Sequence, residues 1–176
     1  MKLLLILALL LPFAAAAQEE GAAPVPPPAA CSDPRHRQFD FWIGSWSVSS
    51  NGQVAGSNSI QPILNGCVLL ENWQGAGAAG LAGKSFNLFD QASGQWHQTW
   101  VDGGGTLLEL NGGLKAGNMV LTGERPAADG SGMTRHRITW TPNADGTVRQ
   151  LWDVSKDGEN WTVLFDGLYE KVLTEE

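Results

Sequence analysis

The sequence predicts an all-β protein, an antiparallel up-and-down β-barrel of about eight to ten strands preceded by a short helical turn. Short β-prone segments recur between residues 45 and 170, and dipeptides that suit tight hairpins separate them, such as Asn51-Gly52, Asn111-Gly112 and Asp145-Gly146. Beyond residue 44, no stretch sustains the i, i+3, i+4 apolar spacing of an amphipathic helix. Closing the meander into a barrel removes the exposed edges that an open sheet would leave.

The N-terminal residues predict export. Lys2 precedes an unbroken apolar run that ends at Pro12, and alanines lead to Ala17, so we expect a secretory signal over residues 1–17. The apolar run is too short to span a bilayer, which needs roughly 20 residues, and we expect no membrane insertion once the signal is removed. Residues 18–30 are rich in proline and alanine and predict an extended tether. The expected location is outside the cytoplasm, in the periplasm of a bacterium.

The folded domain is expected over residues 31–171, with a short tail at 172–176. Asp33 is a candidate N-cap and Pro34 suits the first helical position, which predicts one helical turn before Gly44. The expected strands are 45–50, 54–63, 67–74, 81–89, 95–102, 106–110, 118–124, 134–141, 147–154 and 161–170. A two-sheet sandwich has the same strand spacing and is the structural alternative.

The two cysteines, Cys31 and Cys67, predict one disulfide, because an exported chain folds in an oxidising compartment. Such a bridge would fasten the end of the tether to the barrel. Closing a loop of this length stabilises the folded state by roughly 3 to 4 kcal/mol.

The charge balance excludes two classes of partner. The chain has 11 Lys and Arg against 18 Asp and Glu, a formal net charge of −7, and removing Lys2 with the signal makes it one unit more negative. No block of basic residues offsets this charge, so nucleic acid and anionic membrane surfaces are not expected partners. The oligomeric state is not indicated by the sequence.

Polar residues share strand faces with tryptophans, which predicts a ligand-binding lumen. Alternation along 95–102 places an amide and a carboxylate on the same face as two indoles, and two other strands repeat the mixture. Such a lumen suits a small amphipathic or hydroxylated molecule that stacks on indoles and forms a few hydrogen bonds. The candidate ligand-binding residues are Trp96, Gln98, Trp100, Asp102, Glu71, Trp73, Gln150 and Trp152.

Other interpretations of these residues stay open. They are structural tryptophans with satisfied polar neighbours if the barrel is filled, and a register shift of one residue turns the polar groups to water. Arg137 is a candidate cation for Asp102 or Glu71 in the lumen, or a solvated surface residue.

No motif indicates a metal, a cofactor or a catalytic residue. His36, His97 and His136 are isolated, without the spacing of a zinc site, and no nucleophile elbow or nucleotide-binding loop is present. Reversible binding is therefore the main expectation. One alternative is a hydrolase or isomerase that uses Asp102 or Glu71 with a raised pKa. The other is an interaction module with a filled core that belongs to the cell envelope.

Two motifs, Phe-Asp-Phe-Trp-Ile-Gly-Ser-Trp at 39–46 and Trp-His-Gln-Thr-Trp-Val-Asp at 96–102, resemble a family of uncharacterised secreted bacterial proteins. The resemblance covers about residues 31–171 and implies a calycin-like barrel. Gly44-x-Trp46 is also similar to the opening of lipocalins, which implies that Trp42, Gly44 and Trp46 form the barrel floor. A lipocalin usually adds a long C-terminal helix and an arginine on that tryptophan, and this chain has no such helix after Lys171.

Overall fold

The computed structural model describes residues 31–78 and 80–172 as a closed antiparallel barrel of ten strands in the order β1-β10-β9-β8-β7-β6-β5-β4-β3-β2. Each strand pairs with its sequence neighbours, and β1 closes the barrel against β10. The up-and-down barrel predicted from the sequence is confirmed, and the two-sheet sandwich is excluded. The expected signal and tether, and residues 173–176 of the expected tail, lie outside the described residues.

Two short 3-10 helices precede the strands, η1 (Pro34–Arg37) and η2 (Asp40–Trp42). The side chain of Asp33 caps η1 by accepting a hydrogen bond from the backbone N–H of Arg35 (2.8 Å), as the sequence predicts. The strands are β1 (Gly44–Ser50), β2 (Gln53–Ile63), β3 (Val68–Gly75), β4 (Ala82–Asp90), β5 (Gln95–Asp102), β6 (Leu107–Lys115), β7 (Asn118–Pro126), β8 (Met133–Pro142), β9 (Val148–Ser155) and β10 (Thr162–Lys171).

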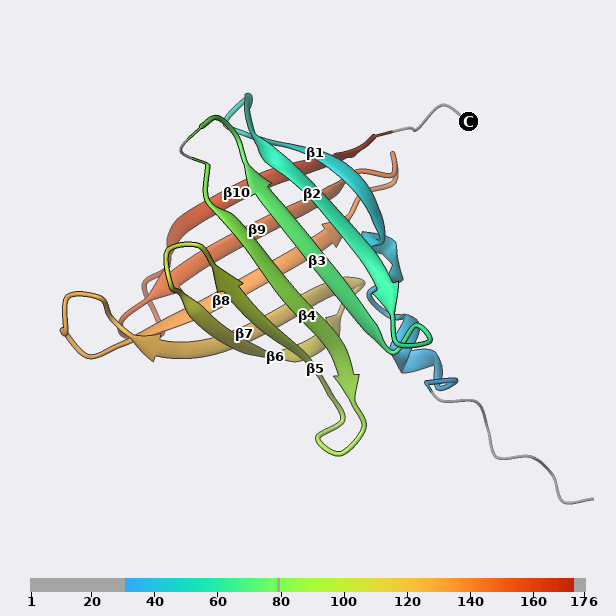
Figure 1. The fold of residues 1–176 in the computed structure, drawn as a ribbon. Coiled ribbons are helices and arrows are strands. Elements are labelled where there is room, and N and C mark those ends of the chain that lie inside the picture. The colour runs from blue at the N-terminus through green and yellow to red at the C-terminus, as the bar shows by residue number, and fades with distance from the viewer. Residues whose placement is uncertain (1–30, 79, 173–176) are drawn as a thin grey trace, which may run out of the picture.

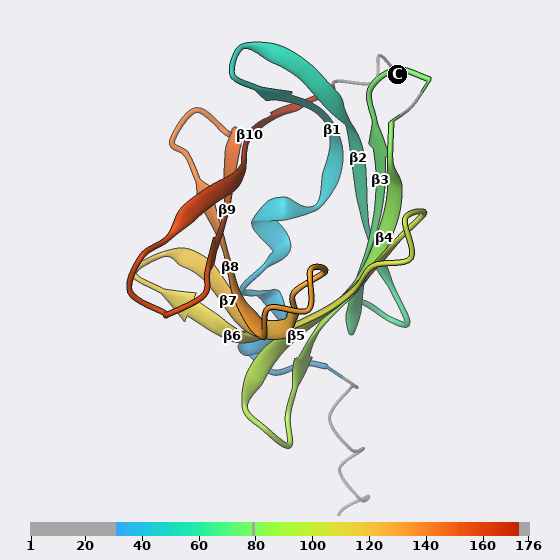
Figure 2. The same ribbon diagram turned by 90° about the vertical axis from the view of Figure 1, so that its left-hand side faces the viewer.

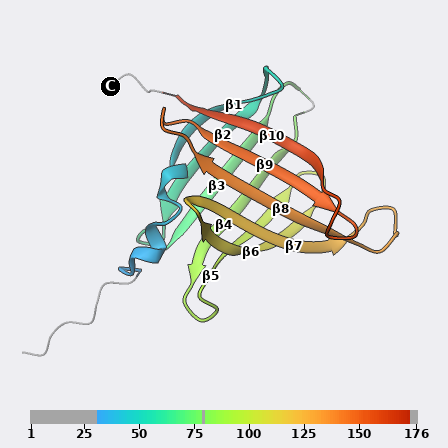
Figure 3. The ribbon, with the colours of Figure 1, turned by 180° about the vertical axis from the view of Figure 1, so that it is seen from behind.

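The two ends of the barrel differ. The helices η1 and η2 lie across one end, which we call the floor, and Figure 2 shows them beyond the ring of strands. The β2–β3 and β4–β5 connections meet this end, where Arg37 donates to the carbonyl of Gly66 and Gln91 contacts His36 (3.1 Å). The opposite end, which we call the mouth, is formed by the β1–β2, β3–β4, β5–β6, β7–β8 and β9–β10 connections (Figures 1 and 3).

The predicted turn at Asn111-Gly112 is wrong. Both residues lie inside β6, which continues to Lys115, and the turn follows at Ala116 and Gly117, where φ is +48° and +84°. Gly112 instead allows β6 to pack closely against β7. A Cβ atom added to Gly112 would lie 2.1 Å from the carbonyl oxygen of Val120 on β7, so only glycine permits the two strands to approach this closely.

Aromatic side chains fill the floor. Phe39 stacks on Trp42 (4.9 Å between ring centroids) and meets Trp140 edge to face, and all three are fully buried. The indole N–H of Trp46 donates to the carbonyl of Trp42 (2.9 Å), which links β1 to η2. The packing closes this end of the barrel to solvent, because aromatic rings of this size bury a large apolar area.

Gly44, Trp46 and Lys171 lie together where β1 begins, at the floor of the barrel. Gly44 has φ +147°, a backbone conformation that other residues rarely adopt, and a Cβ atom added to it would lie 3.5 Å from the Trp46 indole and from the Lys171 side chain. The Lys171 ammonium lies 5.4 Å from the centroid of the Trp46 ring. The last residue of β10 therefore supplies a cation on this tryptophan without a C-terminal helix.

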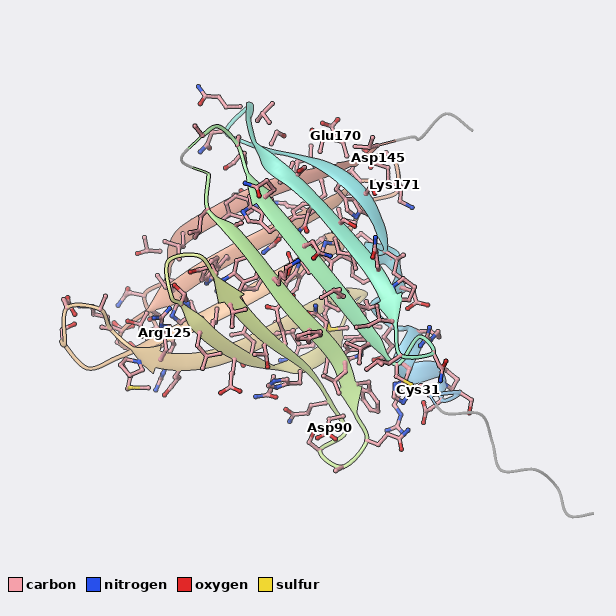
Figure 4. The ribbon with its side chains drawn as sticks, in the orientation of Figure 1. Cys31, Asp90, Arg125, Asp145, Glu170 and Lys171 are labelled. Atoms are coloured by element: carbon pink, nitrogen blue, oxygen red, sulfur yellow. A yellow bond between two sulfur atoms is a disulfide. The ribbon has the colours of Figure 1, made fainter. Side chains whose placement is uncertain are left out.

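The disulfide between Cys31 and Cys67 is confirmed, with an S–S distance of 2.05 Å across a sequence separation of 36 residues. It joins the first described residue to the β2–β3 connection at the floor (Figure 4). No helix among the described residues is long and apolar enough to cross a membrane.

Candidate ligand-binding cavity

A cavity of about 440 Å³ lies inside the barrel between the aromatic floor and the mouth. Its walls combine indole and phenyl rings with a few polar groups, and half-exposed apolar residues such as Leu81 and Leu164 lie where it meets the mouth. The lining residues are Glu71, Trp73, Leu81, Gln98, Trp100, Asp102, Thr106, Leu108, Arg125, His136, Ile138, Gln150, Trp152, Leu164, Phe165 and Tyr169. The volume is large enough for a small organic molecule.

Glycines beneath the aromatic rings hold the cavity open. A Cβ atom added to Gly83 would lie 2.2 Å from the Trp100 ring. The same addition at Gly56 would lie 2.8 Å from the Trp73 ring. Gly83 and Gly56 lie on the strand beside each indole, so each ring lies against backbone that carries no side chain. Because the rings lie along the wall, the centre of the barrel stays free.

A buried hydrogen-bond network runs along the wall formed by β2 to β5. The Nδ2 of Asn58 donates to one carboxylate oxygen of Glu71 (2.7 Å), and the Ser85 hydroxyl donates to the other. Asn87 then donates to the Ser85 hydroxyl (2.8 Å) and accepts a hydrogen bond from Gln98 (2.8 Å). These polar side chains are buried in an apolar barrel because each one has a partner on an adjacent strand.

The network continues across the barrel closure through Tyr169 on β10. Its hydroxyl donates to the Gln150 side-chain oxygen on β9 and lies 3.4 Å from Nδ2 of Asn58 on β2. Burial, and then the nearby Glu71 carboxylate, raise the pKa of the Tyr169 hydroxyl well above its ordinary value. The hydroxyl therefore stays protonated and keeps its role as a donor.

Glu71 is the ionisable group at the centre of this network, and no cation pairs with it among the described residues. Burial raises the pKa of its carboxyl from 4.5 to about 7, and the hydrogen bonds from Ser85 and Asn58 oppose this shift only in part. The side chain therefore changes charge near neutral pH.

Asp102 has a structural role at the mouth. Partial burial tends to raise the pKa of its carboxyl, but hydrogen bonds from Thr106, Trp100 and Gly104 outweigh it and lower the pKa below the ordinary value. The backbone N–H groups of Gly104 (2.9 Å) and Thr106 (3.0 Å) fix the β5–β6 connection. The Trp100 indole N–H donates to the other oxygen (3.2 Å), so the same carboxylate orients the ring. The alternative of a hydrolase or isomerase that uses Asp102 with a raised pKa is therefore wrong for this residue.

His136 and Arg125 lie on the wall formed by β7 and β8. The Trp152 indole N–H donates to Nδ1 of His136 (3.1 Å), whereas Nε2 of this buried ring has no partner among the described residues. Burial, and then the charge of Arg125, lower the pKa of His136, which favours the neutral ring. Arg125 forms no hydrogen bond or ion pair with another described residue and lies at the mouth, far from Cys31 (Figure 4).

The structure brings most of the sequence-predicted ligand-binding residues together. The cavity is lined by Glu71, Trp73, Gln98, Trp100, Asp102, Gln150 and Trp152. Trp96 shares their face but lies deeper, where its indole N–H donates to Gln38 (3.2 Å) and its ring packs edge to face on Phe39. Trp96 is therefore part of the floor and does not line the cavity.

One interpretation of the sequence placed Arg137 in the lumen as a cation for Asp102 or Glu71, and this interpretation is wrong. Arg137 pairs with Asp153 on the outer face of the barrel (2.5 Å) and its guanidinium lies 4.0 Å from the Trp161 ring centroid. The lining residues that were not predicted from the sequence include Arg125, His136 and Phe165. Arg125 falls one residue beyond the predicted end of its strand, and the face of His136 would have followed from alternation with Ile138 and Trp140.

Within the described part of the chain, no three His, Cys, Asp or Glu side chains gather in a way that would hold a metal ion. Comparison with models of known protein families gave no match, and comparison with curated proteins gave none either. The fold is compatible with the calycin type, while membership of the secreted bacterial family stays a prediction from its motifs.

Proposed function

We propose that this protein is exported and binds a small amphipathic or hydroxylated molecule reversibly in the barrel cavity. The observation that carries the proposal is the cavity of about 440 Å³ walled by Trp73, Trp100, Trp152 and Phe165. A filled core, as an interaction module would have, does not need this space. The disulfide supports an oxidising location.

The wall chemistry fits a ligand with an apolar body and a few polar groups. Indole faces contribute apolar area and stacking to a flat or branched hydrocarbon. Gln98, Gln150 and Glu71 supply hydrogen-bonding groups deeper in the barrel, where a ligand hydroxyl would replace water. Hydrogen bonds to neighbouring side chains hold them in place before the ligand arrives, which lowers the entropy cost of binding. These neighbours are Asn58 and Ser85 for Glu71, Asn87 for Gln98 and Tyr169 for Gln150.

One observation favours a second candidate function, acid–base catalysis by Glu71. Its carboxyl has a pKa of about 7, which suits a general acid or base at neutral pH. Both of its oxygens already accept hydrogen bonds from Asn58 and Ser85, so the observation supports the binding role more strongly. A rate that depends on Glu71 for any substrate of the purified protein would favour catalysis.

The binding proposal is tested with Gly83→Ala, a change that acts through Trp100. The new methyl group meets only ring atoms of Trp100 within 3.0 Å, so the ring must leave the wall and enter the cavity. Titration with the neutral fluorophore N-phenyl-1-naphthylamine should give saturable one-site binding to the unaltered protein. We expect Gly83→Ala to weaken it about tenfold or more, about 1.4 kcal/mol.

Gly103→Ala is the matched control. It adds the same methyl group at the mouth, where its nearest neighbour would be 3.6 Å away, an ordinary contact. Its affinity for the fluorophore should equal that of the unaltered protein. Absence of saturable binding, or equal binding by Gly83→Ala, would contradict the assignment of the cavity as the binding site.

A further inference from the structure

Two donor side chains on one wall of the cavity, His136 and Arg125, have N–H groups without an acceptor among the described residues. Six buried side-chain atoms lack a hydrogen-bond partner among the described residues, and Nε2 of His136 is the only one that belongs to a cavity-lining residue. The Arg125 guanidinium, also in the lining, has no ion pair or hydrogen bond within the described chain.

The hydrogen bond from Trp152 fixes which ring nitrogen of His136 carries the proton. An indole N–H only donates, so Nδ1 of His136 must accept and cannot carry a proton. In the neutral ring the proton then resides on Nε2. His136 therefore presents one N–H donor beside the five of Arg125, and none of these donors has a partner among the described residues.

The strand register places the two residues side by side. Gly123 of β7 pairs with His136 of β8, and Arg125 pairs with Thr134, so Arg125 and His136 are diagonal neighbours on the inner face. The charge of Arg125 also reaches the imidazole, since it contributes to the lowered pKa of His136. Gly123, opposite His136, contributes no side chain to the space between them.

The carboxylates of the cavity, unlike the side-chain N–H groups of Arg125 and His136, already have hydrogen-bond partners among the described residues. The Asp102 carboxylate accepts hydrogen bonds from Gly104, Thr106 and Trp100, which meets its need for donors. Glu71 lies on β3, five strands away from β8 in the ten-stranded order, and accepts from Asn58 and Ser85. Donors that a ligand acceptor can use therefore lie on the wall of β7 and β8 and not on the opposite one.

We propose that the cavity selects amphipathic acids, whose carboxylate or phosphate group is bound by Arg125 and His136 while the apolar body lies on the indoles. This inference rests on the proposed function of the cavity and specifies its ligand class. The chain as a whole is negatively charged, so the preference for an anion must come from these local donors. Hydrogen bonds between an arginine and such an ionised group are roughly twice as strong as those between neutral groups.

The test compares ligands that share one ring system. 2-Naphthoate, 2-naphthyl phosphate and the neutral 2-naphthamide are titrated by displacement of N-phenyl-1-naphthylamine from the unaltered protein. We expect at least one of the two anions to bind about ten- to hundredfold more tightly than the amide, the range for hydrogen bonds to a charged group. The tighter anion tells whether the natural head group is a carboxylate or a phosphate.

Arg125→Gln should remove most of this preference and leave the affinity for 2-naphthamide within about twofold. Arg135→Gln is the control, because it changes the net charge equally on the same end of the barrel but alters an exposed ion pair with Glu124 on the outer face. For His136, a nitrogen NMR signal of protonated Nε2 should shift on adding the preferred anion and not on adding the amide.

The outcomes separate this inference from the proposed function. If the fluorophore and the amide bind but neither anion is preferred, or if Arg125→Gln and Arg135→Gln behave alike, the inference is wrong and the binding function stands. If no probe binds at all, the proposed function fails with it.

Discussion

Replacing Glu71 with glutamine should make the protein more stable at neutral and alkaline pH. The carboxyl binds its proton more tightly in the folded than in the unfolded state, because burial raises its pKa from 4.5 to about 7. Its favourable contribution to stability is therefore complete below about pH 4.5 and is lost as the pH rises through about 7. Glutamine imitates the protonated side chain, accepting from Asn58 and donating to Ser85, without ever becoming charged.

The magnitude follows from the pKa difference. Each pKa unit corresponds to about 1.4 kcal/mol, so the difference between 4.5 and about 7 contributes about 3.5 kcal/mol in full, most of it between pH 4 and pH 8. Urea denaturation of both proteins, followed by tryptophan fluorescence, is measured near pH 4 and near pH 8. The difference in unfolding free energy, Glu71→Gln minus the unaltered protein, should rise by about 3 kcal/mol between these values. All groups common to both proteins cancel in this comparison. A difference that does not change with pH would refute the argument that burial holds this carboxyl protonated.

Two further predictions concern the frame around the cavity. Replacing Cys31 and Cys67 together by serine should lower the unfolding free energy by roughly 3 to 4 kcal/mol, because the unfolded chain gains the entropy of the freed loop. A reducing agent should destabilise only the unaltered protein. Equal urea midpoints for the two proteins would contradict this prediction. Gly112→Ala should cost about 2 to 3 kcal/mol because its methyl group would clash with the Val120 carbonyl, whereas Gly113→Ala, which meets nothing within 4 Å, should stay within about 0.5 kcal/mol. Similar midpoints for the two variants would show that β6 and β7 are not as close as described.

The strands and the helical turn could be predicted because their signals are local. Turn dipeptides such as Asn51-Gly52 supply positive φ where hairpins need it, and alternation assigns faces once a strand is located. Asn111-Gly112 misled the same reasoning. There the glycine is required because the neighbouring strand lies too close for a side chain. A glycine required by tertiary packing cannot be distinguished in the sequence from one required by a turn.

The sequence could predict which residues face the inside of the barrel, but not how far each one lies from the floor. Alternation placed Trp96 and Trp100 together inside the barrel, yet it carries no information about distance from the floor, and Trp96 lies among the floor aromatics. The wall glycines under the indoles, Gly56 and Gly83, could not be recognised either, because their role depends on cross-strand register. Arg125 and His136 are isolated in the sequence and meet only through the pairing of β7 with β8.

The central claim, that the barrel holds one small molecule, is tested most directly by native mass spectrometry of residues 18–176 purified from an oxidising compartment. The protein is examined as isolated and after adding N-phenyl-1-naphthylamine. We expect a discrete adduct, one molecule per chain, that is released on denaturation and is depleted in Gly83→Ala. A disulfide-bonded chain that carries no adduct as isolated, and takes up none of the added probe, would contradict it.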